Sequence, residues 1–96
     1  MKIGGIEYTI IHGPLEYCGN YDYERKTITI SDGTNGDVYD EILAHEILHG
    51  LLTHSGANEY LENKGADDEV VVSILSNVFY NFLRDNTDFF NKNYKL

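Results

Sequence analysis

The chain has 96 residues with a formal charge of −9, and 42% of them are hydrophobic, which is the composition of one globular domain spanning residues 1–96. Because no basic cluster accompanies this acidic charge, nucleic acid is excluded as an expected partner. No apolar run is long enough to cross a membrane. Cys18 is the only cysteine, so no internal disulfide can form, and Met1–Gly5 lacks the apolar run of a secretory leader. We therefore expect a cytoplasmic protein, and the sequence leaves its oligomeric state open.

The N-terminal third of the chain predicts three short strands. Residues 2–11 alternate in part between apolar and polar side chains, with a bulge expected at the Gly4-Gly5 pair. The Gly13-Pro14 pair predicts a turn, because proline has no amide proton to give to a neighbouring strand. Two further strands are expected over residues 17–23 and 26–30. Since no crossover helix separates the three, we expect an antiparallel sheet.

Two long helices are predicted in the rest of the chain. The first should run from about Val38 to about His54, and its apolar residues are spread so widely around the helix that we expect burial on nearly all sides. The second should run from about Asp68 to Arg84 and carries an apolar stripe at helical spacing. This stripe consists of Val70, Val71, Ile74, Leu75, Val78, Phe79, Phe82 and Leu83. Because both helices have broad apolar surfaces, we expect them to pack together. A short helical turn is expected within residues 88–96.

A His-Glu-x-x-His motif lies inside the first predicted helix, at His45, Glu46 and His49. Residues four apart lie one turn above each other on the same helix face, so the two imidazoles can meet at one point. Imidazole nitrogens are typical ligands of Zn²⁺, and the Glu46 carboxylate projects beside that point, where it can act on a water molecule. The competing interpretation is a pair of core histidines with a chance glutamate between them. Two unpaired imidazoles in an apolar helix would be costly, so the motif favours zinc.

A hydrolytic zinc site usually has three protein ligands and keeps a fourth position for water. Glu69 follows His49 after residues 50–68 and opens the second predicted helix. A carboxylate in the first turn also suits the helix dipole. Because the two helices are expected to pack together, Glu69 can complete a His₂Glu ligand set. The alternative acidic ligands are Glu59, Glu62, Asp67 and Asp68.

The motif and its spacing to Glu69 resemble those of the thermolysin-like zinc metallopeptidases, the gluzincins. The strands, the loop and the helix around Leu43–His49 also resemble the small ImmA/IrrE-type metallopeptidases of phages and bacteria. The resemblance covers residues 17–84 and rests mainly on the two helices. The fold that we predict from the residues is an α+β domain in which a three-stranded antiparallel sheet packs on two long helices, and the resemblance implies that it is a minimal zincin-like domain.

These observations predict a zinc metalloendopeptidase with a protein or peptide substrate. His45, His49 and Glu69 would hold the ion, while Glu46 would take a proton from water and carry it to the leaving amine. By analogy with other peptide-binding sheets, the strand at Ile28–Ile30 is expected to pair with an extended substrate. No residue matches the tyrosine or histidine that stabilises the oxyanion in thermolysin-like enzymes. The alternative is therefore a zinc-stabilised binding or regulatory module with little or no proteolytic activity, and a weaker one is a metal-free interaction domain.

Four other residues could carry chemistry but have simpler interpretations. His54 misses the third-histidine position of the metzincin pattern by one residue, so we expect it on the surface at the helix end. His12 is assigned to a turn. Cys18 has no basic neighbour to activate it and is expected to be a buried structural thiol. Tyr80 is expected to form part of the polar edge of the second helix.

Overall fold

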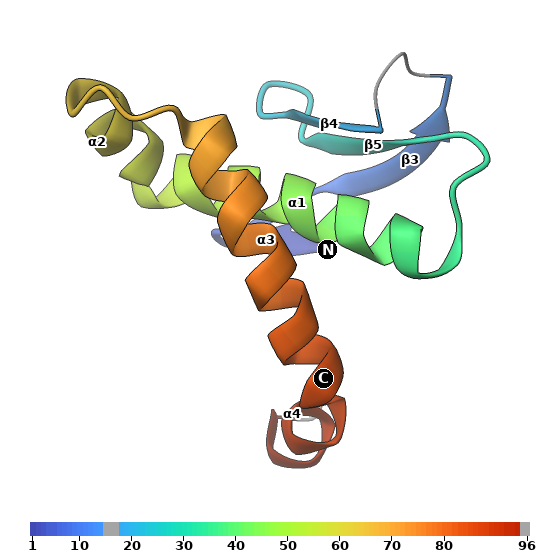
Figure 1. Ribbon diagram of the computed structural model, residues 1–96. Coiled ribbons are helices and arrows are strands. Elements are labelled where there is room, and N and C mark those ends of the chain that lie inside the picture. Colours follow the sequence, from blue (N-terminus) through green and yellow to red (C-terminus); the bar gives the residue numbers. More distant parts are fainter. Residues whose placement is uncertain (15–17, 95–96) are drawn as a thin grey trace.

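The structure is a computed structural model that describes residues 1–14 and 18–94 (Figure 1). Its strands are β1 (Lys2–Ile3), β2 (Ile6–Glu7), β3 (Thr9–Gly13), β4 (Gly19–Asp22) and β5 (Thr27–Ser31). Its helices are α1 (Gly36–Ser55), α2 (Ala57–Asn63), α3 (Asp68–Asp85) and α4 (Thr87–Tyr94). The predicted α+β class is confirmed. Residue 17 of the second predicted strand and residues 95–96 of the terminal helical turn lie outside the described residues.

The main sheet is mixed, so the prediction of a purely antiparallel sheet was wrong. Its strand order is β3-β5-β4, with β5 parallel to β3 and antiparallel to β4. The prediction assumed that strands adjacent in sequence are adjacent in space. Instead, β4 does not pair with β3, because β5 lies between these two strands and pairs with both. Since β3 and β4 run in opposite directions, β5 must be parallel to one of them.

The Gly4-Gly5 pair makes a tight hairpin turn rather than the predicted bulge. Gly4 and Gly5 have φ angles of +59° and +81°, which residues with a side chain rarely adopt. This turn joins β1 to β2 as a two-residue hairpin that is separate from the main sheet. The predicted first strand is therefore divided into β1, β2 and β3.

The core lies between the sheet and α1. Ile28 and Ile30 of β5 have no exposed surface and alternate with threonines, as the sequence predicts. Ile3 and Tyr8 complete the buried cluster. The partly buried side chains packed against it include Ile42, Leu43 and Ile47 of α1, together with Ile10, Tyr21 and Tyr39. This packing holds one face of α1 against the sheet.

Helix α1 is less buried than its composition predicts. Only Glu46 and Gly50 are fully buried among its described residues, while Val38 and Leu51 are exposed. The helix is covered by the main sheet on one side and by α3 on another, and it also contacts α2 and β1 (Figure 1). Within the described residues, no helix combines the length and apolar character that crossing a bilayer requires.

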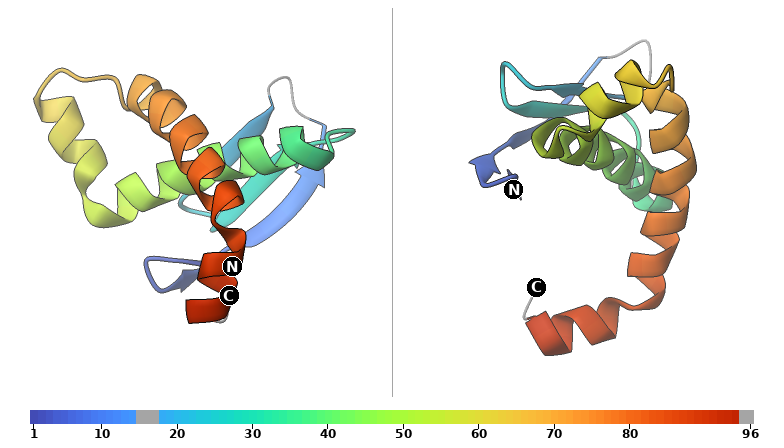
Figure 2. Two further views of the ribbon diagram at one scale, coloured as in Figure 1. Left: turned by 60° about the horizontal axis from the view of Figure 1, so that its bottom comes forward. Right: turned by 90° about the vertical axis from the view of Figure 1, so that its left-hand side faces the viewer.

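Helix α3 crosses α1 with a different face from the one that we predicted. Its buried residues are Val72, Ser76 and Tyr80, whereas most of the apolar stripe is exposed. Polar contacts to α1 fix how α3 is rotated about its own axis. The Tyr80 hydroxyl donates to Asp37 at 3.4 Å, and Glu69 contacts the histidines of the motif. Figure 2 shows that the C-terminal half of α3 extends beyond α1 and carries α4 at its end.

Candidate metal centre

The two histidines of the motif lie on one face of α1, as predicted. The centroids of the His45 and His49 rings are 5.0 Å apart. Their side chains are 23% and 18% exposed, so both are largely covered while solvent still reaches the site. The regular helix therefore positions both Nε2 atoms without any contribution from a loop.

Glu69 lies opposite the histidines, at the start of α3. Its Oε1 atom is 2.8 Å from His45 Nε2, and its Oε2 atom is 2.7 Å from His49 Nε2. The N-terminal capping residue of α3 is Asp67, whose side chain accepts a hydrogen bond from the Glu69 amide at 2.9 Å. This cap fixes the first turn of α3, and Glu69 projects from that turn. The sequence-based choice of Glu69 thus coincides with the carboxylate that α3 brings to the motif.

The donor atoms of His45, His49 and Glu69 are suitable for one metal ion. One potential ligand atom from each residue lies within 4.8 Å of the other two. Around a tetrahedral zinc ion, neighbouring nitrogen and oxygen donors are about 3.3 Å apart. The two histidine–carboxylate distances of 2.7 and 2.8 Å would need to lengthen by only about half an ångström. The alternative ligands Glu59, Glu62, Asp67 and Asp68 are not part of this cluster within the described residues.

Glu46 lies beside the cluster and is almost fully buried. Its exposed fraction is 7%, and burial raises the pKa of its carboxyl group above the usual value of 4.5. The nearby His49 and His45 rings act in the opposite direction and lower this pKa. A largely buried carboxylate next to a candidate metal site is well placed to hold or move a proton.

Gly19 of β4 provides the space in which the Glu46 side chain lies. A methyl group at position 19 would be 3.1 Å from Cγ and 3.2 Å from Oε2 of Glu46. It would also be 2.8 Å from Cγ2 of Ile42, which is closer than carbon atoms can approach. Any larger residue would therefore displace one of the two α1 side chains. A glycine that forms a turn can be recognised from the sequence, but Gly19 lies in strand β4. The sequence therefore contained no indication of this contact.

The cluster opens into a cleft of about 880 Å³ between α1, α3 and the β4 strand. One wall is formed by residues 18–21, and α1 forms the base from Glu41 to His49. Ser73 and Asn77 contribute to the α3 wall. Strand β4 pairs only with β5 within the described residues, so its other edge is unpaired, and Gly19, Asn20 and Tyr21 of this strand line the cleft. The prediction that Ile28–Ile30 offers a free edge was wrong, because β5 is paired on both sides.

All four residues with simple interpretations proved to be placed differently, and His12 lies within strand β3 rather than in a turn. Cys18 is exposed at the cleft rather than buried. Tyr80 is buried and bonded to Asp37, whereas we had assigned it to the polar edge of its helix. His54 is only partly exposed, and its Nε2 atom lies 2.6 Å from the Tyr8 hydroxyl. The placements of Cys18, Tyr80 and His54 depend on which distant segments meet, and that information is not present in local spacing.

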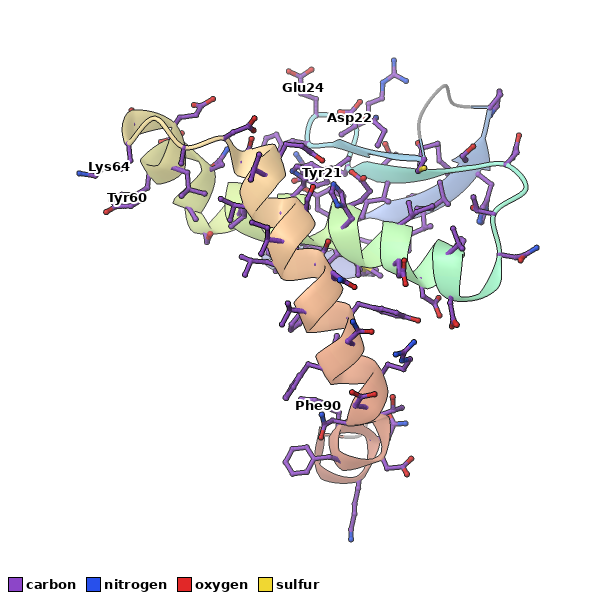
Figure 3. All side chains as sticks on the ribbon, in the orientation of Figure 1. Tyr21, Asp22, Glu24, Tyr60, Lys64 and Phe90 are labelled. Atoms are coloured by element: carbon purple, nitrogen blue, oxygen red, sulfur yellow. The ribbon has the colours of Figure 1, made fainter. Side chains whose placement is uncertain are left out.

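A tyrosine pair, in which Tyr8 is buried and Tyr21 is partly buried, connects His54 to the wall of the cleft. The hydroxyl oxygens of Tyr8 and Tyr21 are 2.7 Å apart, and burial raises the pKa of Tyr21. Figure 3 shows Tyr21 below β4, on the side of the helices, while Glu24 points outward from the β4–β5 turn. The hydrogen bonds between Tyr21 and Tyr8 and between Tyr8 and His54 therefore link β4 to the C-terminal end of α1.

No protein-family model and no curated protein sequence matches this chain. The interpretation of the site therefore depends on the geometry of its own residues.

Proposed function

We propose that His45, His49 and Glu69 bind Zn²⁺ and that the protein is a minimal zincin-like metallopeptidase. The observation that carries this proposal is the convergence of two imidazole nitrogens and one carboxylate from two helices on a single point. Two nitrogen donors and one oxygen donor, with an open side toward a cleft, form the donor set of hydrolytic zinc sites. The resemblance of the motif to gluzincins supports the same assignment.

Glu46 is the residue to which we assign proton transfer. When bound, zinc supplies Lewis acidity, which lowers the pKa of water and polarises a carbonyl group. The Glu46 carboxylate accepts a proton from water as the carbonyl carbon is attacked. It then donates that proton to the amine that leaves when the peptide bond breaks. The burial that raises the pKa of Glu46 suits the second step, because it makes the protonated form easier to reach.

The substrate is proposed to be an extended peptide that lies along β4. The unpaired edge of this strand borders the cleft, and a peptide strand could pair with its backbone. The metal ligands on α1 lie across the cleft from that edge. A peptide bound in this way would present its backbone carbonyls to the site without any requirement on its side chains.

The Glu46→Gln variant tests hydrolysis separately from zinc binding. We expect zinc-loaded wild-type protein to cleave an unfolded protein substrate such as reduced, alkylated casein, with new termini detected by mass spectrometry. The Gln side chain fills the same space but cannot accept the proton, so we expect the rate to fall about 10²-fold or more while zinc content is kept. Glu59→Gln, on α2, is the matched control. An unchanged rate in Glu46→Gln would refute the assigned role.

One observation favours the alternative of a zinc-stabilised binding or regulatory module. Tyr21 is the only tyrosine that lines the cleft in the described part of the chain, and its hydroxyl is bonded to Tyr8. The cleft therefore offers no obvious oxyanion donor of the thermolysin type among these residues. A protein with stoichiometric zinc and an intact fold that cleaves none of a broad set of peptides would support the module.

A further inference from the structure

Helix α3 presents a continuous apolar surface to solvent. We name it the α3 apolar face and define it as Val70, Ile74, Leu75, Val78, Phe79 and Phe82. Each of these side chains is between 40% and 64% exposed, with Val78 the most exposed. The face takes no part in the cleft, because α3 lines the cleft with Glu69, Ser73, Ser76 and Asn77. It therefore calls for an explanation other than catalysis.

The six side chains form one patch rather than scattered contacts. Positions 70, 74, 78 and 82 follow one another at single-turn spacing, and positions 75 and 79 lie in the adjacent row. From Val70 to Phe82 the patch is about 20 Å long, at 1.5 Å per residue. Single exposed apolar residues are normal on a protein surface, but a continuous patch of this kind marks an interaction site. The C-terminal half of α3 extends beyond α1 (Figure 2), and there the Phe82 ring contacts Phe90 of α4 while Phe82 stays 52% exposed.

The charges around the α3 apolar face define what can cover it. No charged residue occurs from Val70 to Phe82. Carboxylates lie beyond both ends, with Asp67 and Asp68 before the face and Asp85 after it. The Arg84 guanidinium does not offset the acidic end, because it lies over the ring of Tyr80, on the side toward α1. The surface is thus apolar in the middle and acidic at both ends.

We propose that the α3 apolar face docks an amphipathic helix of a partner protein that carries basic residues at both ends. A partner helix of about thirteen residues would match the length of the patch. Its apolar stripe would cover the face, and its terminal lysines or arginines would meet the acidic ends. A second copy of this chain fits less well, because parallel and antiparallel pairing both bring acidic ends together. The net charge of −9 also opposes self-association and favours a basic partner.

A designed peptide tests this proposal directly. The probe is a fluorescent peptide of about eighteen residues that forms a helix with leucines on one face, alanine and glutamine elsewhere, and lysine pairs at both ends. Two comparison peptides have the same composition in scrambled order, or glutamate pairs in place of lysine. We expect the first peptide to bind with an affinity that falls as salt is raised. We expect the two comparison peptides to bind at least about tenfold more weakly.

Variants of the protein locate the binding surface. Val78→Asp places a charge at the centre of the face and should weaken binding at least about tenfold. Val38→Asp introduces the same change at an exposed valine of α1 and should leave binding unchanged. Circular dichroism tests whether both variants are folded. If Val78→Asp unfolds, the milder Val78→Ala takes its place and should also weaken binding.

Three kinds of result would overturn the proposal. One is equal binding of the lysine and glutamate peptides, or equal binding by Val78→Asp and Val38→Asp. Another is a dimer in sedimentation velocity that Val78→Asp abolishes, because a second copy would then cover the face. The third is binding to phosphatidylserine vesicles without binding to the peptide. None of these results depends on zinc or on hydrolysis.

Discussion

Replacing Glu69 by Ala should separate zinc affinity from the stability of the metal-free fold. The Glu69 side chain contacts both histidines, yet it is 58% exposed and lies in the first turn of α3. An exposed ion pair and a first-turn carboxylate each contribute no more than about 1 kcal/mol to the free energy of unfolding. The metal-free variant should therefore remain folded with a slightly lower melting temperature.

The effect on zinc should be much larger. Structural zinc sites with four ligands have binding free energies of about 10–16 kcal/mol, so one ligand accounts for about 3 kcal/mol. Loss of Glu69 should then weaken the zinc Kd about a hundredfold. If free zinc is about 100 times the wild-type Kd, the zinc-induced stabilisation of about 2.7 kcal/mol should largely disappear. For a chain of this size this is a loss of about 10–20 °C in the melting temperature.

The assay is a zinc titration against a chromophoric chelator, together with melting curves with and without zinc. Asp68→Ala is the matched control, because it removes a carboxylate from the same turn of α3 that is not part of the cluster. Its zinc Kd should stay close to that of the wild type. If Glu69→Ala and the wild type bound zinc equally, or if Asp68→Ala lost more affinity, the assigned ligand set would be refuted.

Two further predictions concern the surroundings of Glu46. Gly19→Ala should lower the free energy of unfolding by about 1–3 kcal/mol and slow hydrolysis, because its methyl group would displace Ile42 or Glu46. Denaturant titration measures the first effect, and a variant as stable and active as the wild type would show that the contact is unimportant. In metal-free protein, burial raises the pKa of the Glu46 carboxyl group above its ordinary value of 4.5. Protonation of this group therefore stabilises the folded state. The stabilisation is fully present below pH 4.5 and is lost as the pH rises through the folded-state pKa. Glu46→Gln, which cannot ionise, should therefore be more stable than the wild type at pH 7, and melting curves should show this gain vanish below about pH 4.5. A constant difference across that range would contradict it.

The sequence was sufficient to bring the candidate ligands His45 and His49 together, because their placement depends on local geometry. The helical period alone puts His45 and His49 on one face. The position of Glu69 required one more assumption, that the second helix packs on the first and begins near the motif. Both helices exist close to their predicted bounds, and the cap at Asp67 fixes the turn that carries Glu69.

The sequence was not sufficient where the outcome depends on which segments meet. Apolar content suggested that the stripe of α3 packs on α1, but the contacts of Glu69 and Tyr80 turn that stripe outward. The prediction of the strand order was wrong for a related reason, because β5 lies between β3 and β4. The bond between His54 and Tyr8 joins residues far apart in the chain, and no periodicity could indicate it.

The most direct test of the proposed metal centre is X-ray absorption at the zinc edge on zinc-loaded protein. The spectrum should show two imidazole nitrogens and carboxylate or water oxygens at about 2.0–2.2 Å, with one zinc for each chain. Because Cys18 lines the same cleft, the spectrum can also detect a different ligand set. A sulfur ligand at about 2.3 Å, or less than stoichiometric zinc after dialysis, would contradict the His45–His49–Glu69 site.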